Sequence, residues 1–256
     1  MPFTKLDGYE IHYTLCGPEQ PEKRLMYVHG TGCNSAVWHR HCDSMSNSHQ
    51  CVAIDLPGHG QSEGSGFRGT ADYAHFVQAL AETLGWDRYI LVGHSLGGAI
   101  ALTVAVYHPG NLSGLILVDT GARLRVEPEI LDAARRAAKG EVMPPSDPRW
   151  TYAVNTPDSV IEAVRADLGD VSSDIIYRDW VADDTFDFLH RVKSIETPAI
   201  AICGDEDPIT PVRNHVYFHT QMPRCELEVI RECGHWPAYE KPGLFDSIVE
   251  RFVNQL

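Results

Sequence analysis

The chain has 256 residues, which is long enough to bury a substantial core in one large α/β domain. Its formal net charge of −14 argues against nucleic acid and anionic membrane surfaces as partners, because both require clustered Lys and Arg. Seven cysteines at irregular spacings indicate reduced thiols rather than a disulfide framework or a zinc site. The sequence shows neither a membrane-spanning run nor a signal-peptide pattern, so a cytoplasmic location is expected.

The first half of the chain alternates short apolar runs with helical patterns. Residues 3–15 alternate polar and apolar positions around Asp7-Gly8, which predicts an N-terminal hairpin. Buried strands are predicted at 25–28, 51–54, 89–92 and 115–118, and helices at 34–46, at 70–84 and after Ser95. Either Thr70 or Asp72 is expected to cap the second of these helices. This alternation indicates a parallel sheet with helices on both faces.

The rhythm changes after the run at 115–118. Residues 122–191 show helical patterns at 127–139, 158–168 and 172–189 and no buried strand, which predicts a helical cap inserted into a core domain of residues 1–121 and 192–256. The cap is rich in acids, which are expected on a solvated outer face: Asp167, Asp170, Asp174, Asp179, Asp183, Asp184 and Asp187. Strands at 198–203 and 226–230 and a closing helix at 244–256 follow. The predicted fold is therefore a doubly wound, mostly parallel eight-stranded sheet with a helical cap.

The apolar run at 89–92 leads into a short glycine-bearing motif. Residues 93–97 read Gly-His-Ser-Leu-Gly, the pattern G-x-S-x-G, with Ser95 at its centre. A sharp strand-to-helix turn strains the central serine and exposes its hydroxyl, and the glycines avoid collisions with the strand and helix. The first N–H groups of the following helix, Leu96 among them, point at whatever reacts with Ser95. Ser95 is therefore a candidate nucleophile, with a purely structural glycine turn as the alternative.

A nucleophilic serine needs a base within hydrogen-bond reach and a carboxylate that orients the base. In doubly wound sheets the ligand site lies beyond the carboxyl ends of the strands. His235 follows the last predicted strand and Asp207 follows the strand before it, so both are expected near Ser95. The chain order Ser, Asp, His is the one expected of this architecture. Asp119 and Asp205 remain alternatives for the carboxylate.

Five motifs together resemble the α/β-hydrolase superfamily over essentially the whole chain. They are His-Gly-Thr-Gly at 29–32, Asp-Leu-Pro-Gly-His-Gly-Gln-Ser at 55–62, the G-x-S-x-G motif, Gly204-x-x-Asp207, and Gly-His-Trp-Pro at 234–237. The resemblance is to a serine esterase-like member with a helical cap. It implies a catalytic triad of Ser95, Asp207 and His235, and an oxyanion hole formed by the backbone N–H groups of Thr31 and Leu96.

The leading functional prediction is a serine hydrolase of small or medium carboxylic esters. One alternative keeps the triad but changes the bond, because residues 233–236, Cys-Gly-His-Trp, resemble carbon–carbon bond hydrolases that cleave ring-opened aromatic products. Such enzymes need an arginine for a substrate carboxylate, and the candidates are Arg123, Arg149, Arg165 and Arg178. A second alternative is a ligand-binding or sensing protein on a hydrolase scaffold.

The remaining predictions concern ligands and partners. Residues 64–69 fit G-x-G-x-x-G but lie well downstream of a strand, so a surface loop is favoured and no cofactor is expected. No metal site is expected at His39, His41 and Cys42, because His39 and His41 would point to different helix faces. The expected partner is a small-molecule substrate, with no nucleic acid or membrane, and nothing predicts an oligomeric state. Four residues are predicted to line the substrate pocket: Trp38, Trp150, Trp180 and Trp236.

Overall fold

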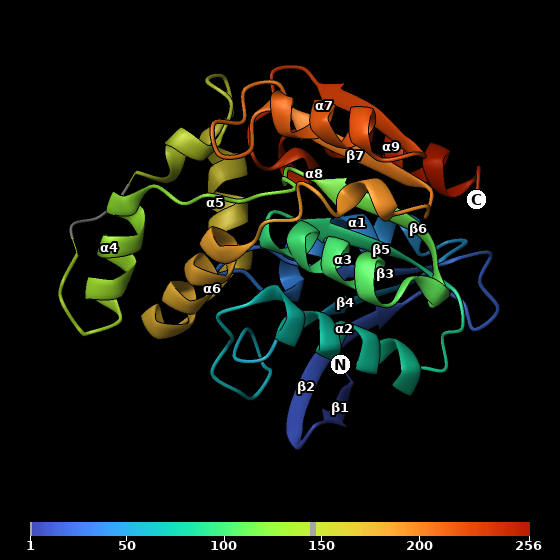
Figure 1. The fold of residues 1–256 in the computed structure, drawn as a ribbon, viewed down its shortest axis with the longest axis horizontal. Coiled ribbons are helices and arrows are strands. Elements are labelled where there is room, and N and C mark those ends of the chain that lie inside the picture. Colours follow the sequence, from blue (N-terminus) through green and yellow to red (C-terminus); the bar gives the residue numbers. More distant parts are fainter. Residues whose placement is uncertain (1, 144–146) are drawn as a thin grey trace.

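The computed structural model describes residues 2–143 and 147–256, and within these ranges eight strands form one sheet (Figure 1). The spatial order is β1-β2-β4-β3-β5-β6-β7-β8, in which β1 and β2 are antiparallel, β2 is antiparallel to β4, and the other neighbours are parallel. The strands are β1 (Phe3–Leu6), β2 (Tyr9–Cys16), β3 (Arg24–Val28), β4 (Gln50–Ile54), β5 (Tyr89–His94), β6 (Leu112–Val118), β7 (Ala199–Gly204) and β8 (Cys225–Ile230). The predicted doubly wound sheet is thereby confirmed.

Two apolar clusters sandwich the sheet, because the strands bury side chains on both faces. One face packs against α2 (Thr70–Thr83), α3 (Leu96–Tyr107) and α7 (Val212–Gln221), and the other against α1 (His39–Met45) and α9 (Pro242–Val253). The central strands β3 and β5 carry fully buried Tyr27 and Ile90. Each such side chain contributes roughly 1.5–3 kcal/mol through burial. The sheet is therefore a rigid base for the loops at its carboxyl edge.

Between β6 and β7 the described chain is helical. This segment contains α4 (Pro128–Ala137), the 3-10 helix η3 (Pro148–Thr151), α5 (Asp158–Leu168) and α6 (Ser173–Thr185), and η4 (Val192–Ser194) leads back to the sheet. In Figure 1 these cap helices, coloured yellow-green to gold, lie to one side of the sheet, with α6 beside the amino end of α3. The arrangement places α6 next to the turn between β5 and α3.

Several helix boundaries differ from the predicted ones. The helix predicted at 34–46 begins as the 3-10 helix η1 (Ser35–Trp38), and the one predicted at 172–189 ends at Thr185 because Phe186 is extended. The capping of α2 by Thr70 or Asp72 was wrong: the N-cap is Gly69, and the Thr70 hydroxyl accepts a hydrogen bond from Thr103. The predictions omitted four short helices of the described chain: η2 (Pro109–Asn111), η3, η4 and α8 (Pro237–Glu240).

The structure bears on two expectations, one about membrane-spanning helices and one about the cysteines. In the described ranges, no helix combines the length and the apolar character needed to cross a membrane. All seven cysteines are free, and every one of them except Cys16 is buried.

Candidate active site

Ser95 lies at the turn from β5 into α3, in an unusual backbone conformation. Its φ is 54° and its ψ is −120°, a region that few non-glycine residues adopt. Its N–H donates to Val118 O at 3.0 Å and its carbonyl accepts from Thr120 Oγ1 at 2.8 Å, so neighbouring chain segments hold the strained turn. A Cβ on Gly93 would lie 2.2 Å from Gly97 O, so only glycine allows this turn. The serine thus has the geometry of a nucleophile elbow.

His235 and Asp207 form a buried pair at the carboxyl ends of β8 and β7. His235 Nδ1 lies 2.8 Å from Asp207 Oδ2, and both side chains are almost fully buried. Asp207 also accepts hydrogen bonds from the N–H groups of Ile209 (2.8 Å) and Thr210 (3.2 Å) and from Thr210 Oγ1 (2.6 Å). Burial acts to raise the pKa of Asp207, but His235 and these donors outweigh it and hold the pKa well below its ordinary value. Asp207 is therefore a charged partner for His235.

Neither of the two alternative carboxylates is hydrogen-bonded to the His235 ring among the described residues. Asp119 follows β6, is fully buried, and accepts a hydrogen bond from Gly204 N at 3.0 Å. Burial, together with the charge of Asp207, raises its pKa well above the usual range. Asp205 is exposed and donates its backbone N–H to Ile230 O. Of the three candidates for the carboxylate, Asp207 contacts the His235 ring.

A second histidine supports the His235 loop from behind. The ring centroids of His94 and His235 are 4.7 Å apart, and His94 Nε2 lies 2.8 Å from His235 O. Burial and the charge of His235 lower the pKa of His94 to about 3, so the ring is neutral and donates this hydrogen bond. Its packing fixes the backbone that carries His235.

The same cluster meets the distance criterion for a metal site. His94, Asp119 and His235 each offer one ligand atom, and these atoms lie within 4.8 Å of one another. However, the raised pKa of Asp119 means that a metal would have to displace its proton, and His235 Nδ1 already contacts Asp207. We therefore interpret the cluster as support for His235. In the segment predicted to bind no metal, His41 contacts Asp246 and His39 is exposed.

The turn at 29–32 runs directly beside Ser95. A Cβ on Gly30 would lie 3.1 Å from Ser95 Cβ, which shows how closely this turn approaches the nucleophile elbow. Leu96 begins α3, so its N–H has no acceptor in the helix itself. Within the described residues, the backbone N–H groups of Thr31 and Leu96 donate to no protein acceptor. Both groups are available to a ligand oxygen.

The Ser95 hydroxyl and the His235 ring are not joined by a hydrogen bond in the described part of the chain. Catalytic hydrogen bonds are often long in a free enzyme and shorten when the substrate binds. The arrangement therefore offers a candidate nucleophile, an oriented base and free N–H donors. The hydrogen bond between Ser95 and His235 is expected to form when a substrate binds.

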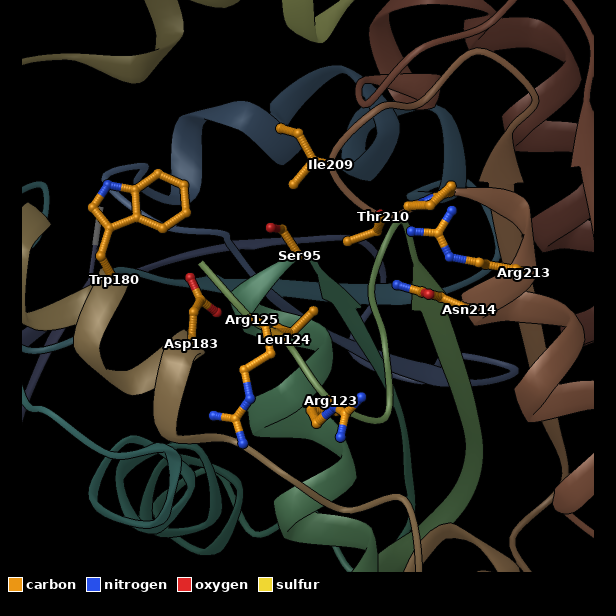
Figure 2. A pocket seen from close by; sticks show the side chains of 11 residues that line it. Ser95, Arg123, Leu124, Arg125, Trp180, Asp183, Ile209, Thr210, Arg213 and Asn214 are labelled. Carbon is orange, nitrogen blue, oxygen red and sulfur yellow. The ribbon is translucent and has the colours of Figure 1, made fainter. Parts of the chain in front are cut away.

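Ser95 opens into a cavity of about 230 Å³ between the core and the cap. Figure 2 shows Trp180 and Asp183 of α6 on one side of Ser95, and Ile209 and Thr210 of the β7–α7 loop on the other. The residues that line the cavity are Ser95, Arg123, Leu124, Arg125, Trp180, Asp183, Ile209, Thr210, Pro211, Arg213 and Asn214. The cavity is small enough to suit a short acyl chain rather than a large ligand.

Three arginines line this cavity even though the chain is strongly acidic. Arg123, Arg125 and Arg213 are exposed, and in Figure 2 the guanidinium groups of Arg123 and Arg125 lie below Ser95. Asp187 approaches Arg123 and Arg125 only at 3.9 and 3.7 Å. Exposed ion pairs this long contribute little, so these arginines remain able to bind an anionic group.

The predicted arginines and tryptophans are dispersed. Arg123 lines the cavity, whereas Arg149 pairs with Asp158 and Arg178 with Asp174, and Arg165 lies on exposed surface of α5. Trp180 lines the cavity, whereas Trp38 and Trp236 border a separate small apolar cavity of about 10 Å³. Trp150 is 51% exposed beside another surface hollow. One tryptophan of the four, Trp180, therefore lies beside Ser95.

Helix α6 attaches the cap to the core through Asp179. Its carboxyl accepts hydrogen bonds from Gly32 N (2.9 Å), His59 Nε2 (2.8 Å) and Tyr73 OH (2.6 Å). Burial alone would lower the pKa of His59, but the charge of Asp179 outweighs it and raises this pKa. A salt bridge with no exposed surface therefore joins the cap to two loops and a helix of the core.

The expectation that the cap aspartates form a solvated face was wrong for two of them. Asp179 is 0% exposed and Asp183 is 3% exposed, because both share the face of α6 that carries buried Ile175 and Ala182. Asp183 Oδ2 accepts a hydrogen bond from Thr31 Oγ1 at 2.6 Å. A helical plot of 175, 179, 182 and 183 would have placed both aspartates on an apolar stripe. The many acidic residues of this segment suggested a solvated face and obscured the apolar stripe.

The chain is similar in sequence to a known protein family and to a curated relative. The model of the family described as "Alpha/beta hydrolase family" matches residues 25–247. A 2-hydroxy-6-oxononadienedioate/2-hydroxy-6-oxononatrienedioate hydrolase of Burkholderia vietnamiensis is 27% identical, over 97% of this chain and 93% of its own length.

Two solved structures extend the likeness. A structure described as that of a thermophilic esterase is 30% identical, with a TM-score of 0.80, and the match covers 99% of this chain and 97% of the other. The enol-lactonase of Burkholderia xenovorans LB400 is 20% identical, with a TM-score of 0.88, over 99% of this chain and 100% of its own. The second likeness concerns the fold alone.

Proposed function

The chain belongs to the alpha/beta hydrolase family, and on that premise we propose that it is a serine hydrolase that cleaves small carboxylic esters through an acyl-enzyme on Ser95. The observation that carries the proposal is the strained Ser95 at the base of a cavity of about 230 Å³. The buried His235–Asp207 pair lies at the same sheet edge. This combination suits acyl transfer better than passive ligand binding, because a binding pocket needs no strained serine.

The geometry supports the following roles for the site residues. Ser95 attacks the ester carbonyl and loses its proton to His235 Nε2, which then protonates the departing alcohol. His235 next activates a water that hydrolyses the acyl-enzyme, releasing the acid and restoring Ser95. Asp207 holds Nδ1–H of His235 and so fixes the tautomer that leaves Nε2 free. The N–H groups of Thr31 and Leu96 hold the oxyanion, each contributing roughly 3 kcal/mol in the transition state.

The test compares the Ser95→Ala variant with the unaltered protein on a short-chain p-nitrophenyl ester. We expect loss of hydrolysis by roughly 10⁴-fold or more, and no labelling by a fluorophosphonate, because the acyl-enzyme cannot form. Ser44→Ala is the matched control, since Ser44 is exposed on α1. Undiminished turnover by Ser95→Ala would refute the proposal. A ligand that raises the melting temperature without any turnover would favour a binding protein instead.

The arginines favour a second candidate, carbon–carbon bond hydrolysis of a ring-opened dienoate. A dienoate of this kind carries a carboxylate, which Arg123, Arg125 and Arg213 suit at the far end of the cavity. The Burkholderia vietnamiensis relative is named for a reaction on such a dioate. Measuring kcat/KM for a yellow dienoate beside that for a simple ester separates the two candidates. A dienoate preference of tenfold or more would replace the ester assignment.

A further inference from the structure

Asp183 lines the cavity beside Ser95 and has a buried carboxyl oxygen without a partner among the described residues. Its Oδ2 is bound by Thr31 Oγ1, whereas Oδ1 is buried and has no hydrogen-bond partner within the described residues. Asp179, one turn earlier on α6, has three donors and no free oxygen. Figure 2 shows the Asp183 carboxyl turned toward Ser95. A buried oxygen without a partner is costly to the fold unless something else binds it.

We propose that Asp183 is a substrate-binding residue whose Oδ1 donates a hydrogen bond to an oxygen of the acyl group bound at Ser95. This inference rests on the proposed function and adds a substrate class to it. The preferred acyl groups carry an ether, hydroxyl or carbonyl oxygen close to the scissile carbonyl, because Thr31 holds Asp183 next to the predicted oxyanion donors.

The protonation of Asp183 suits the role of a donor. Its pKa is raised to about 8, mainly by burial and also by the charges of Asp179 and Asp184, while the hydrogen bond from the Thr31 hydroxyl acts in the opposite direction. At neutral pH the carboxyl is therefore mostly protonated. With Oδ2 accepting from Thr31, the proton is left to Oδ1, which has no partner among the described residues.

The other titratable groups nearby are engaged elsewhere. From the core, His59 and Tyr73 bond to Asp179 rather than to Asp183. His235 contacts Asp207 rather than Asp183. The three guanidinium groups, on Arg123, Arg125 and Arg213, line the cavity without an ion pair to Asp183 among the described residues.

A matched pair of substrates tests the hydrogen bond. The p-nitrophenyl esters of methoxyacetic and butanoic acids differ by one ether oxygen in place of one methylene. Asp183→Leu should lower the methoxyacetate-to-butanoate ratio of kcat/KM about 10-fold, because the donor is lost. Asp183→Asn keeps a donor and should retain the ratio. The control is Asp174→Asn, an exposed position on the same helix. An unchanged ratio in Asp183→Leu would overturn the proposal.

The pH profile gives a second readout that packing alone would not move. In the unaltered protein, kcat/KM for the methoxyacetate should fall above a pH of about 8 as Asp183 ionises, whereas in Asp183→Asn this fall should be absent. If both proteins lose activity alike above this pH, a donating Asp183 is refuted.

The inference can be separated from the proposed function. With Ser95→Ala protein, calorimetry measures ester binding without turnover, and tighter binding of the methoxyacetate should disappear in Ser95→Ala combined with Asp183→Leu. An unaltered protein that hydrolyses no ester but keeps this binding preference would refute the esterase and retain Asp183 as a ligand-binding residue. Equal binding of both esters would overturn the inference even where hydrolysis is robust.

Discussion

Two buried carboxyl groups, one in the core and one in the cap, show opposite protonation. Asp207, in a loop of the core, has a lowered pKa, whereas Asp183, on a cap helix, has a pKa raised to about 8. Burial acts on both in the same direction. The difference comes from the donors: Asp207 receives four hydrogen bonds, including one from His235, and Asp183 receives one, from Thr31. A buried carboxyl is charged where the backbone and a base surround it, and neutral where they do not.

This contrast suggests different roles for the core side and the cap side of the cavity. The core side orients a base through a fixed negative charge, which requires the short, rigid β7–α7 loop. On the cap side, the Asp183 carboxyl has an oxygen without a partner among the described residues, and Arg123 and Arg125 line the cavity. These groups are available to a bound substrate. Changes to Asp207 should therefore affect the rate, whereas changes to the cap or to the guanidinium groups that line the cavity should affect stability or substrate preference.

The largest effect is expected from Asp207→Asn. The amide cannot stabilise a protonated His235 and favours the wrong tautomer, so kcat on a p-nitrophenyl ester should fall by about 10⁴-fold. Asp205→Asn serves as the control, because Asp205 is exposed two residues earlier. A loss of less than tenfold in Asp207→Asn would contradict the contrast, since the charge of Asp207 would then be dispensable.

A large effect on stability is expected from Asp179→Ala. The change leaves His59, Tyr73 and Gly32 N buried without their acceptor, and breaking such a pair costs about 3–5 kcal/mol of unfolding free energy. Urea unfolding measures the loss, with Asp170→Ala as the control because Asp170 is exposed. If the two variants unfold at the same urea concentration, Asp179 does not hold the cap to the core.

A smaller effect is expected from Arg213→Gln at the cavity rim. For an ester with a terminal carboxylate, KM should rise about 10-fold, equivalent to about 1.4 kcal/mol, and KM for an uncharged ester of equal length should change little. Arg231→Gln is the control, because Arg231 is exposed and lies outside the cavity lining. Equal changes in KM for both esters would mean that Arg213 does not recognise charge.

The strands and the mostly parallel sheet could be predicted from the sequence. Continuous apolar runs such as Leu25–Val28 and Ile200–Cys203 identify strands buried on both faces, because no other short element needs such a run. The positions of Ser95, Asp207 and His235 could also be predicted, since each follows a strand and the carboxyl ends of parallel strands meet at one edge. These predictions depend on local pattern and on topology alone.

Only the tertiary structure decided what faces Ser95 from the cap. Asp179 and Asp183 have the composition of a solvated surface, and their burial depends on how α6 packs against the turn at 29–32 and on α2. Arg125 and Arg213, and the choice of Trp180 among four tryptophans, likewise follow from the rotation of elements that are distant in sequence. The physical reason is that the helical period shows which side chains share one face of a helix, but not which other element packs against that face. The sequence by itself placed Ser95, Asp207 and His235 each after a strand of the sheet, and packing determined which side chains line the cavity beside Ser95.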